Sequence, residues 1–158
     1  MDTLKKIIAE AFKYKYISES AVEWIGGHPW DDDLFHKNAE KFGLSVEQEF
    51  ISVRGKSLEF DYVVLNTPTV FYHATPKENV EKIKKEGLLL SNSAEQSRGK
   101  YVVGVFLSGS SEGISRWRGD NTAVLKIILP RGTKVYQDRQ SNAVFVRENI
   151  PSKFISVN

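Results

Sequence analysis

The 158-residue chain contains no cysteine, which excludes disulfide bonds and thiolate metal sites. It also lacks a run of 18 apolar residues, and its N-terminus lacks the apolar stretch of a signal peptide. We therefore expect neither a membrane span nor secretion. The absence of cysteine suits a reducing compartment, and together these absences predict a soluble, cytoplasmic protein.

Common phosphate and metal signatures are absent as well, because the sequence has no Walker motif, no GxGxxG and no HExxH. His28 and His36 flank the acidic run Asp31–Asp33, but this spacing matches no standard set of metal ligands. We interpret the acidic run as the N-terminal cap of a helix, where negative charge is stabilising. No metal site is predicted.

The charges present are unevenly divided along the chain. Residues 1–66 hold 8 Lys and Arg against 12 Asp and Glu, a net charge of −4, whereas residues 67–158 hold 14 against 8, a net charge of +6. A basic half suggests an anionic partner such as a dinucleotide or a nucleic acid. A solvated basic surface would give the same numbers, so both interpretations stay open.

The first part of the chain shows three helical patterns followed by two strand patterns. Apolar residues recur at helical spacing near the N-terminus, and glycines stop the next two helices. Two strands then flank a turn with the sequence RGKS. Three helices and a hairpin are the ingredients of a winged helix. The expected elements are helices at 1–16, 18–25 and 31–43 and strands at 46–53 and 57–65.

After Pro68 the pattern alternates between strands and helices. The segment TVFYHA has the composition of a buried strand, and Gly87 and Pro130 mark the ends of later elements. The pattern predicts a strand-rich C-terminal half with helices at 77–87 and 110–117 and strands at 69–74, 101–108, 122–129, 133–137, 142–150 and 153–157.

His73 stands at the end of the first of these strands, and a helix that closes on EGL and the strand GVFLS follow it at short intervals. This order resembles the ADP-ribosyltransferase fold, in which two such strands form the walls of a nicotinamide pocket. The corresponding segments here are YHAT, residues 72–75, and GVFLS, residues 104–108.

Over nearly the whole chain the sequence is similar to the NAD-dependent RNA 2'-phosphotransferases. The similarity rests on six short motifs in the family's order, namely LKKIIAEAFKYKY, ISVRGKSLEFD, PTVFYHAT with the following I and GL, VFLS, RWRG and SNAVFVRENIPSKFI. The resemblance implies an α+β fold, with a winged-helix-like N-lobe over residues 1–66 and an ADP-ribosyltransferase-like, mixed β-sheet C-lobe that binds NAD over residues 67–158.

That family transfers a 2'-phosphate from RNA to NAD. The RNA phosphate attacks the anomeric carbon of the nicotinamide ribose and expels nicotinamide, and the ribose 2''-hydroxyl then displaces the RNA, leaving ADP-ribose cyclic phosphate. Because nicotinamide leaves as a neutral pyridine, the first step depends mainly on orientation and charge stabilisation. The resemblance implies NAD as cofactor and an RNA, such as a 2'-phosphorylated splice-junction tRNA, as partner.

The resemblance also assigns roles in the NAD pocket. His73 and the backbone of Ala74 and Thr75 would hold the ribose and the carboxamide of NAD. Ala74 replaces the family's glycine, and its methyl group narrows the space in which the backbone can approach the cofactor. The ring of Phe106 would stack on nicotinamide, and Ser108 would offer a hydroxyl to the carboxamide.

Arginine and asparagine complete the implied C-lobe site. Arg116 or Arg118 would clamp a phosphate, and the RG context favours Arg118. Asn142 and Ala143 stand where other ADP-ribosyltransferases place a glutamate and where the phosphotransferases carry Asn-Gly.

The N-lobe departs from the family at its catalytic cations. Lys13 and Tyr14 align with the family's Arg-His pair, Ser52 aligns with an arginine, and Lys56 aligns with a histidine. Lys13 keeps a point charge without a bidentate fork, and Arg54 and Lys56 can restore positive potential. Losing one side chain that stabilises the transition state typically raises the activation free energy by about 2.7–4 kcal/mol, which lowers the rate roughly 10²–10³-fold. Phosphate transfer is therefore expected to be slow unless Arg54 and Lys56 provide the missing positive charge.

Two other functions stay open. An intact cofactor pocket beside an altered N-lobe suits an ADP-ribosyltransferase that modifies a nucleic-acid end or a protein. The same features suit a catalytically degenerate protein that binds NAD or RNA. The sequence does not fix the oligomeric state, and we take a monomer as the expectation.

Overall fold

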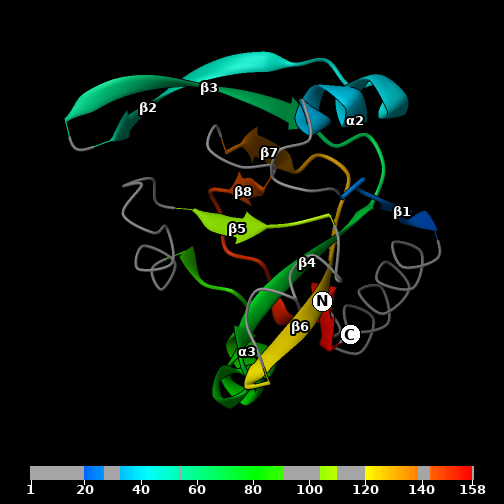
Figure 1. Ribbon diagram of the computed structural model, residues 1–158, viewed down its shortest axis with the longest axis vertical. Helices are drawn as coiled ribbons and strands as arrows, with labels where there is room; N and C mark the ends of the chain where they lie inside the picture. The colour runs from blue at the N-terminus through cyan, green and yellow to red at the C-terminus, as the bar shows by residue number, and fades with distance from the viewer. Residues whose placement is uncertain are drawn as a thin grey trace, which may run out of the picture.

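In the residues that it describes, the computed structural model shows a mixed α+β protein built mostly from two β-sheets, with two short α-helices (Figure 1). None of the helices in the described part of the chain is long and apolar enough to cross a membrane. The structure describes residues 20–26, 33–53, 55–90, 104–109, 120–138 and 143–157.

The four-stranded sheet has the strand order β1-β4-β6-β9. Its two central strands pair antiparallel over eight residues, from Thr69 opposite Leu129 to Pro76 opposite Thr122. The short first strand adds in parallel and the last strand adds antiparallel. The strands span Val22–Glu23 (β1), Thr69–Pro76 (β4), Thr122–Leu129 (β6) and Ile155–Val157 (β9).

The five-stranded sheet is antiparallel throughout, with the order β2-β3-β7-β8-β5. A hairpin of the first two strands forms one edge, and a positive φ of 77° at Gly55 allows its tight turn. The strands span Glu47–Val53 (β2), Lys56–Val64 (β3), Lys134–Gln137 (β7), Val144–Val146 (β8) and Val105–Leu107 (β5).

The two α-helices have recognisable end signals. Helix α2, Leu34–Phe42, begins after Asp33, whose side chain accepts a hydrogen bond from the backbone N–H of His36, and ends at Gly43 with φ 66°. Helix α3, Val80–Glu86, continues the 3₁₀ turn η1, Lys77–Asn79, and ends at Gly87. A second 3₁₀ turn, η4, spans Ser152–Phe154.

The main hydrophobic core draws on both sheets and on α2. Trp24 lies at its centre, with ring centroids 5.9 Å from Phe35 and 5.3 Å from Phe71. Because Val63 and Leu65 belong to the same core, residues before and after Thr67 are buried together. The pairing of β1 with β4 and of β3 with β7 also crosses this position. The division into an N-lobe of residues 1–66 and a C-lobe of residues 67–158 stays a prediction. Both sheets contain strands from each of these two ranges.

Most of the predicted elements in the described residues are confirmed. The helices at 31–43 and 77–87 correspond to α2 and to η1 with α3, and strands occur within all the predicted strand ranges. The prediction for 142–150 was too long, because β8 covers only Val144–Val146. The predicted helices at 1–16 and 110–117 lie outside the described residues, and the winged helix stays a prediction.

The helix predicted at 18–25 was wrong for residues 22–23, which form β1. Two backbone hydrogen bonds explain the difference, since Val22 N–H donates to Pro68 O at 3.0 Å and Trp24 N–H donates to Val70 O at 3.2 Å. This extended backbone lets Trp24 reach the core, where it is 2% exposed. Tertiary burial thus outweighs a local helical pattern.

Candidate functional site

The two sheets meet at one backbone bridge between β4 and β5. The N–H of Tyr72 donates to Ser108 O at 2.7 Å, and the N–H of Ser108 donates to Tyr72 O at 2.9 Å. This bridge places the segments YHAT and GVFLS side by side, although 28 residues, 76–103, separate them in the chain. The candidate site is built on this bridge.

His73 follows the bridge directly and is 5% exposed. Its Nδ1 lies 2.8 Å from the backbone oxygen of Phe106. A carbonyl oxygen can only accept, so Nδ1 carries the proton that is donated, and in the neutral ring Nε2 keeps its lone pair. The hydrogen bond therefore fixes both the orientation and the tautomer of the imidazole.

Thr75 lies two residues further along β4, on the same face of the strand as His73. Its side chain is 2% exposed, and within the described residues no group forms a hydrogen bond with its hydroxyl oxygen. An unsatisfied buried hydroxyl costs free energy unless a partner is supplied. The hydroxyl of Thr75 is thus a buried polar group for which the described residues supply no hydrogen-bond partner.

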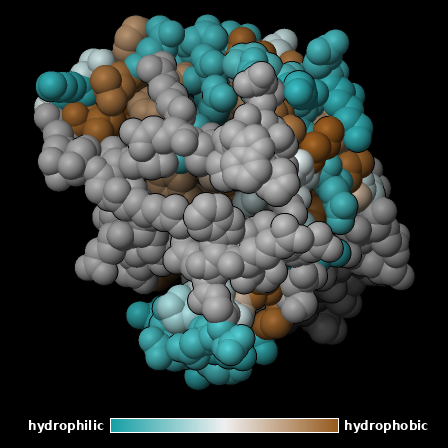
Figure 2. Space-filling view, in the orientation of Figure 1, coloured by the Kyte–Doolittle hydropathy of each residue, from teal (hydrophilic) through white to brown (hydrophobic). Residues whose placement is uncertain are grey.

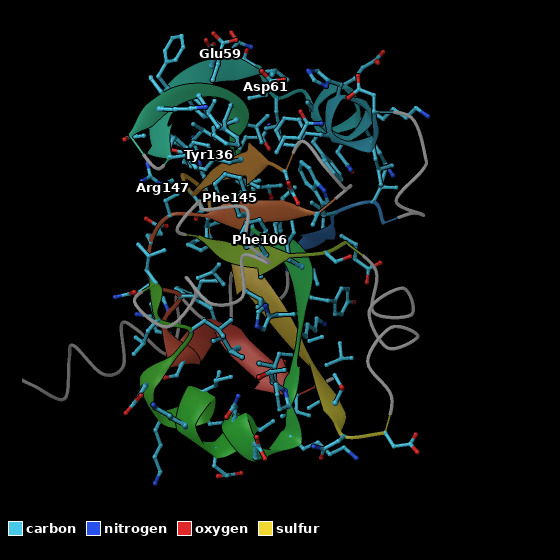
Figure 3. The ribbon with its side chains drawn as sticks, turned by 60° about the vertical axis from the view of Figure 1, so that its left-hand side comes forward. Glu59, Asp61, Phe106, Tyr136, Phe145 and Arg147 are labelled. Carbon is cyan, nitrogen blue, oxygen red and sulfur yellow. The ribbon has the colours of Figure 1, made fainter. Side chains whose placement is uncertain are left out.

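An aromatic row crosses the five-stranded sheet on the face opposite to the main core (Figure 3). Phe106 on β5 pairs with Phe145 on β8, which pairs with Tyr136 on β7, which pairs with Tyr62 on β3. Successive ring centroids are 5.2, 5.2 and 5.6 Å apart. Phe106, the half-buried residue at the β5 end of the row, packs against Phe145.

Gly104 lies beside this row because the row leaves no room for a side chain. A Cβ at this position would come within 2.8 Å of the Phe145 ring, closer than ordinary van der Waals contact. The glycine of GVFLS is thus explained by packing against Phe145.

Glu49 on β2 is the centre of a polar cluster at the other end of the row. Its carboxylate accepts from Lys134 Nζ at 2.9 Å and from the Tyr136 hydroxyl at 2.7 Å, and Arg147 lies 4.0 Å away. Hydrogen bonds from Lys134 and Tyr136 hold the pKa of Glu49 below its ordinary value. Burial, together with this carboxylate, raises the pKa of Tyr136, so its hydroxyl stays protonated and donates.

We expect Glu49→Gln to lower the free energy of unfolding at neutral pH by about 1 kcal/mol, because solvent screens these partly exposed contacts. Since the folded-state pKa is lowered, the carboxylate stabilises the fold fully above its unfolded-state pKa of about 4.3. The stabilisation is lost as pH falls through the folded-state value. The difference in urea midpoint between wild type and variant should therefore shrink below about pH 5.

Glu47→Gln is the matched control, because Glu47 lies on the same face of β2 and forms no ion pair with any described residue. It should leave the midpoint unchanged across the pH range. An equal loss of stability in both variants would show that general charge, rather than the cluster, is responsible.

Five of the residues predicted for the cofactor site are brought together by the bridge. They lie on β4 and on β5 with the residue that follows it, and they are His73, Ala74, Thr75, Phe106 and Ser108. Their contact with a cofactor stays a prediction. The predicted residues Lys13, Tyr14, Arg54, Arg116, Arg118 and Asn142 lie outside the described residues.

Ser52 and Lys56 are exposed on the β2–β3 hairpin, at the sheet edge opposite to β5 in strand order. The neighbours of Ser52 in the chain, Ile51 and Val53, belong to the apolar cluster that contains Phe145, and Phe106 packs against this cluster. The β2–β3 hairpin and strand β5 therefore pack against the same apolar cluster. The catalytic roles of Ser52 and Lys56 stay predictions.

Two polar features were not predicted, namely the cluster around Glu49 and the buried residue Asp138. The cluster around Glu49 joins positions more than 80 residues apart, which no local pattern signals. Asp138 is buried at the end of β7, where its N–H donates to Ala143 O at 3.1 Å. Its position directly after the strand predicted at 133–137 was the signal that the sequence offered.

Comparison of the sequence with known protein families and with curated proteins found no match.

Proposed function

We propose that the protein is an NAD-dependent transferase of the RNA 2'-phosphotransferase type, which moves an RNA 2'-phosphate to NAD and releases nicotinamide and ADP-ribose cyclic phosphate. The observation that carries the proposal is the hydrogen bond from His73 to the Phe106 carbonyl beside the Tyr72–Ser108 bridge. It supports the proposal because the resemblance requires these two segments to form adjoining walls. The proposal includes a winged-helix-like N-lobe, an ADP-ribosyltransferase-like C-lobe and a cytoplasmic location.

In this proposal the chain's own residues bind and orient NAD, which supplies an electrophilic ribose carbon and a neutral leaving group. His73 presents Nε2 in the tautomer fixed by Phe106, and Thr75 offers its buried hydroxyl. Ser108 would bind the carboxamide, and Phe106 would cover the nicotinamide ring. Holding the reacting ribose in one orientation is the main contribution expected of these residues.

The phosphate would be held by cations. Arg118, Lys13, Arg54 and Lys56 are the candidates, and of these the structure describes only Lys56, which is exposed. A cation near the developing charge stabilises the transition state more than the ground state. With a point charge, Lys13, in place of one arginine and an uncharged Ser52 in place of another, the reaction should be slower than with a complete clamp.

The direct test incubates the purified protein with NAD and a short RNA carrying an internal 2'-phosphate. Nicotinamide, dephosphorylated RNA and ADP-ribose cyclic phosphate should appear in equal amounts, as measured by liquid chromatography with mass detection. The same RNA without the 2'-phosphate is the control and should give no cyclic product. Absence of all three products at high protein concentration would contradict the proposal.

A second candidate is an ADP-ribosyltransferase that acts on a nucleic-acid end or a protein. Ser52 favours it, because a serine cannot replace an arginine clamp for phosphate. Labelled NAD would then mark an acceptor without any 2'-phosphate, and the label would be lost with His73. Binding of NAD with no turnover on any acceptor would favour the degenerate NAD- or RNA-binding protein instead.

A further inference from the structure

Strand β2 forms an open edge of the five-stranded sheet. Within the described residues it pairs only with β3, and Figure 1 shows it at the rim of the molecule with β3 between it and β7. The pairing with β3 is regular over seven residues, and β2 contains no proline, lysine or bulge. Proteins usually protect exposed edges with one of these features or with charged side chains. Strand β2 carries two charged residues, Glu47 and Glu49, and Glu49 is paired with Lys134 inside the chain. This edge is therefore available for pairing.

The edge also carries an exposed aromatic side chain. Phe50, at the middle of β2, is 66% exposed, which is the highest value among the large apolar residues that the structure describes. Figure 2 shows apolar atoms among polar ones at the upper left, over the region of the β2–β3 hairpin in Figure 1. Single exposed apolar residues are common on protein surfaces, but this one lies at the middle of a strand that is unpaired on its outer side within the described residues.

The hairpin determines which backbone groups point outward. Val53 pairs with Lys56, so only two residues connect the strands, and such a closing pair is hydrogen-bonded. Hydrogen-bonded positions alternate along an antiparallel pair. The residues that direct N–H and C=O groups to the open edge are therefore Gln48, Phe50 and Ser52.

We propose that a second copy of this chain pairs with the open edge, β2 against β2, about a twofold axis at Phe50. The three outward-facing residues are symmetric about Phe50, so an antiparallel copy meets each outward donor and acceptor with its complement. Phe50 then lies opposite Phe50 of the second copy, and Gln48 lies opposite Ser52 of the second copy. The result is a continuous ten-stranded sheet with an isologous interface.

The charges on β2 favour this register over the one with its axis at Gln48, and an axis at Ser52 would pair only residues 51–53 of each strand. With the axis at Phe50, Glu47 faces Val53 of the second copy and Glu49 faces Ile51 of the second copy, so no two acids oppose each other. With the axis at Gln48, Glu47 would face Glu49 of the second copy, and like charges directly opposite are destabilising. The charge of Glu49 is already paired with Lys134 inside its own chain.

The predicted dimer is weak and depends on protein concentration. One pair of edge strands buries less surface than the roughly 1,200–2,000 Å² of a stable interface. Main-chain hydrogen bonds and the central aromatic pair provide most of the contact. This inference is independent of the proposed enzymatic activity.

Cysteine cross-linking tests the register, because the natural chain has no cysteine to interfere. Opposite residues in a hydrogen-bonded pair have Cα atoms about 5.5 Å apart, which suits a disulfide. Under mild oxidation, Phe50→Cys should form a disulfide-linked dimer. Gln48→Cys and Leu58→Cys are controls, the first on the same edge but off the axis and the second exposed on β3, and both should stay monomeric. Equal cross-linking of all three variants would overturn the proposal.

Sedimentation of the unmodified chain provides the second test. The average mass should rise with protein concentration towards that of a dimer, and Phe50→Pro should abolish the rise. Proline removes an outward N–H while leaving the bonds to β3 in place, and edge strands tolerate it there. Circular dichroism confirms that the variant is folded. A wild type that stays monomeric up to millimolar concentration, or a folded proline variant that still dimerises, would overturn the proposal.

Discussion

Replacing His73 with alanine is expected to lower the rate of nicotinamide release from NAD by about 10²- to 10³-fold. The imidazole is buried, and its hydrogen bond to the Phe106 carbonyl holds it in one orientation and one tautomer. Alanine removes both this contact and the group that the proposal directs towards the ribose. The rate is measured by single-turnover chromatography at saturating NAD.

Two polar substitutions separate a role in binding from a role in folding. The amide nitrogen of asparagine can occupy nearly the position of Nδ1, so His73→Asn keeps a donor for the Phe106 carbonyl. The longer His73→Gln places its amide near Nε2 and loses that donor. We expect the asparagine variant to be as stable as the wild type and as inactive as the alanine variant. The glutamine variant should be less stable than the asparagine variant and should release nicotinamide faster than it does.

The reverse order would contradict this assignment. If His73 only joins β4 to β5, activity should follow stability, so that asparagine restores nicotinamide release and glutamine does not. Denaturant midpoints measured on the same samples supply the stability of each variant. The NAD concentration is raised in each assay to show that weak binding alone does not explain the loss.

Local signals in the sequence were sufficient to predict most described elements. Asp33 and Gly43 bracket α2 as a cap and a left-handed stop, and Gly55 marks the turn of the β2–β3 hairpin. These signals act within a few residues, so they can be read without knowledge of the fold. They fail at Val22–Glu23, where the partner strand is more than 40 residues away.

The site shows the same division between local and distant causes. Strand character and a histidine could be predicted for TVFYHA, and the resemblance supplied the association with GVFLS that periodicity alone does not give. The structure brings these segments together through the Tyr72–Ser108 bridge. It also contains the cluster around Glu49, whose partners come from β2, β7 and the end of β8. Such a cluster could not be predicted, because its members meet only after the sheet has formed.

Phe145→Ala should be the most destabilising substitution on the five-stranded sheet, with a loss of about 3–5 kcal/mol in the free energy of unfolding. The side chain is 1% exposed, and its ring contacts those of Phe60, Phe106 and Tyr136 at centroid distances of 5.6, 5.2 and 5.2 Å. Alanine leaves a cavity that three rings from different strands cannot easily fill. For a chain of this length the melting temperature should fall by roughly 6–20 °C.

Phe50→Ala is the matched control, because the same atoms are removed from a side chain that is 66% exposed. It should change the free energy of unfolding by less than about 0.5 kcal/mol. Guanidinium titrations at low protein concentration provide both values and avoid any contribution from dimerisation. Comparable losses in the two variants would show that the aromatic row does not support the sheet. A large loss confined to Phe145→Ala would show that the burial of this ring among Phe60, Phe106 and Tyr136, rather than the loss of an aromatic side chain in general, stabilises the five-stranded sheet.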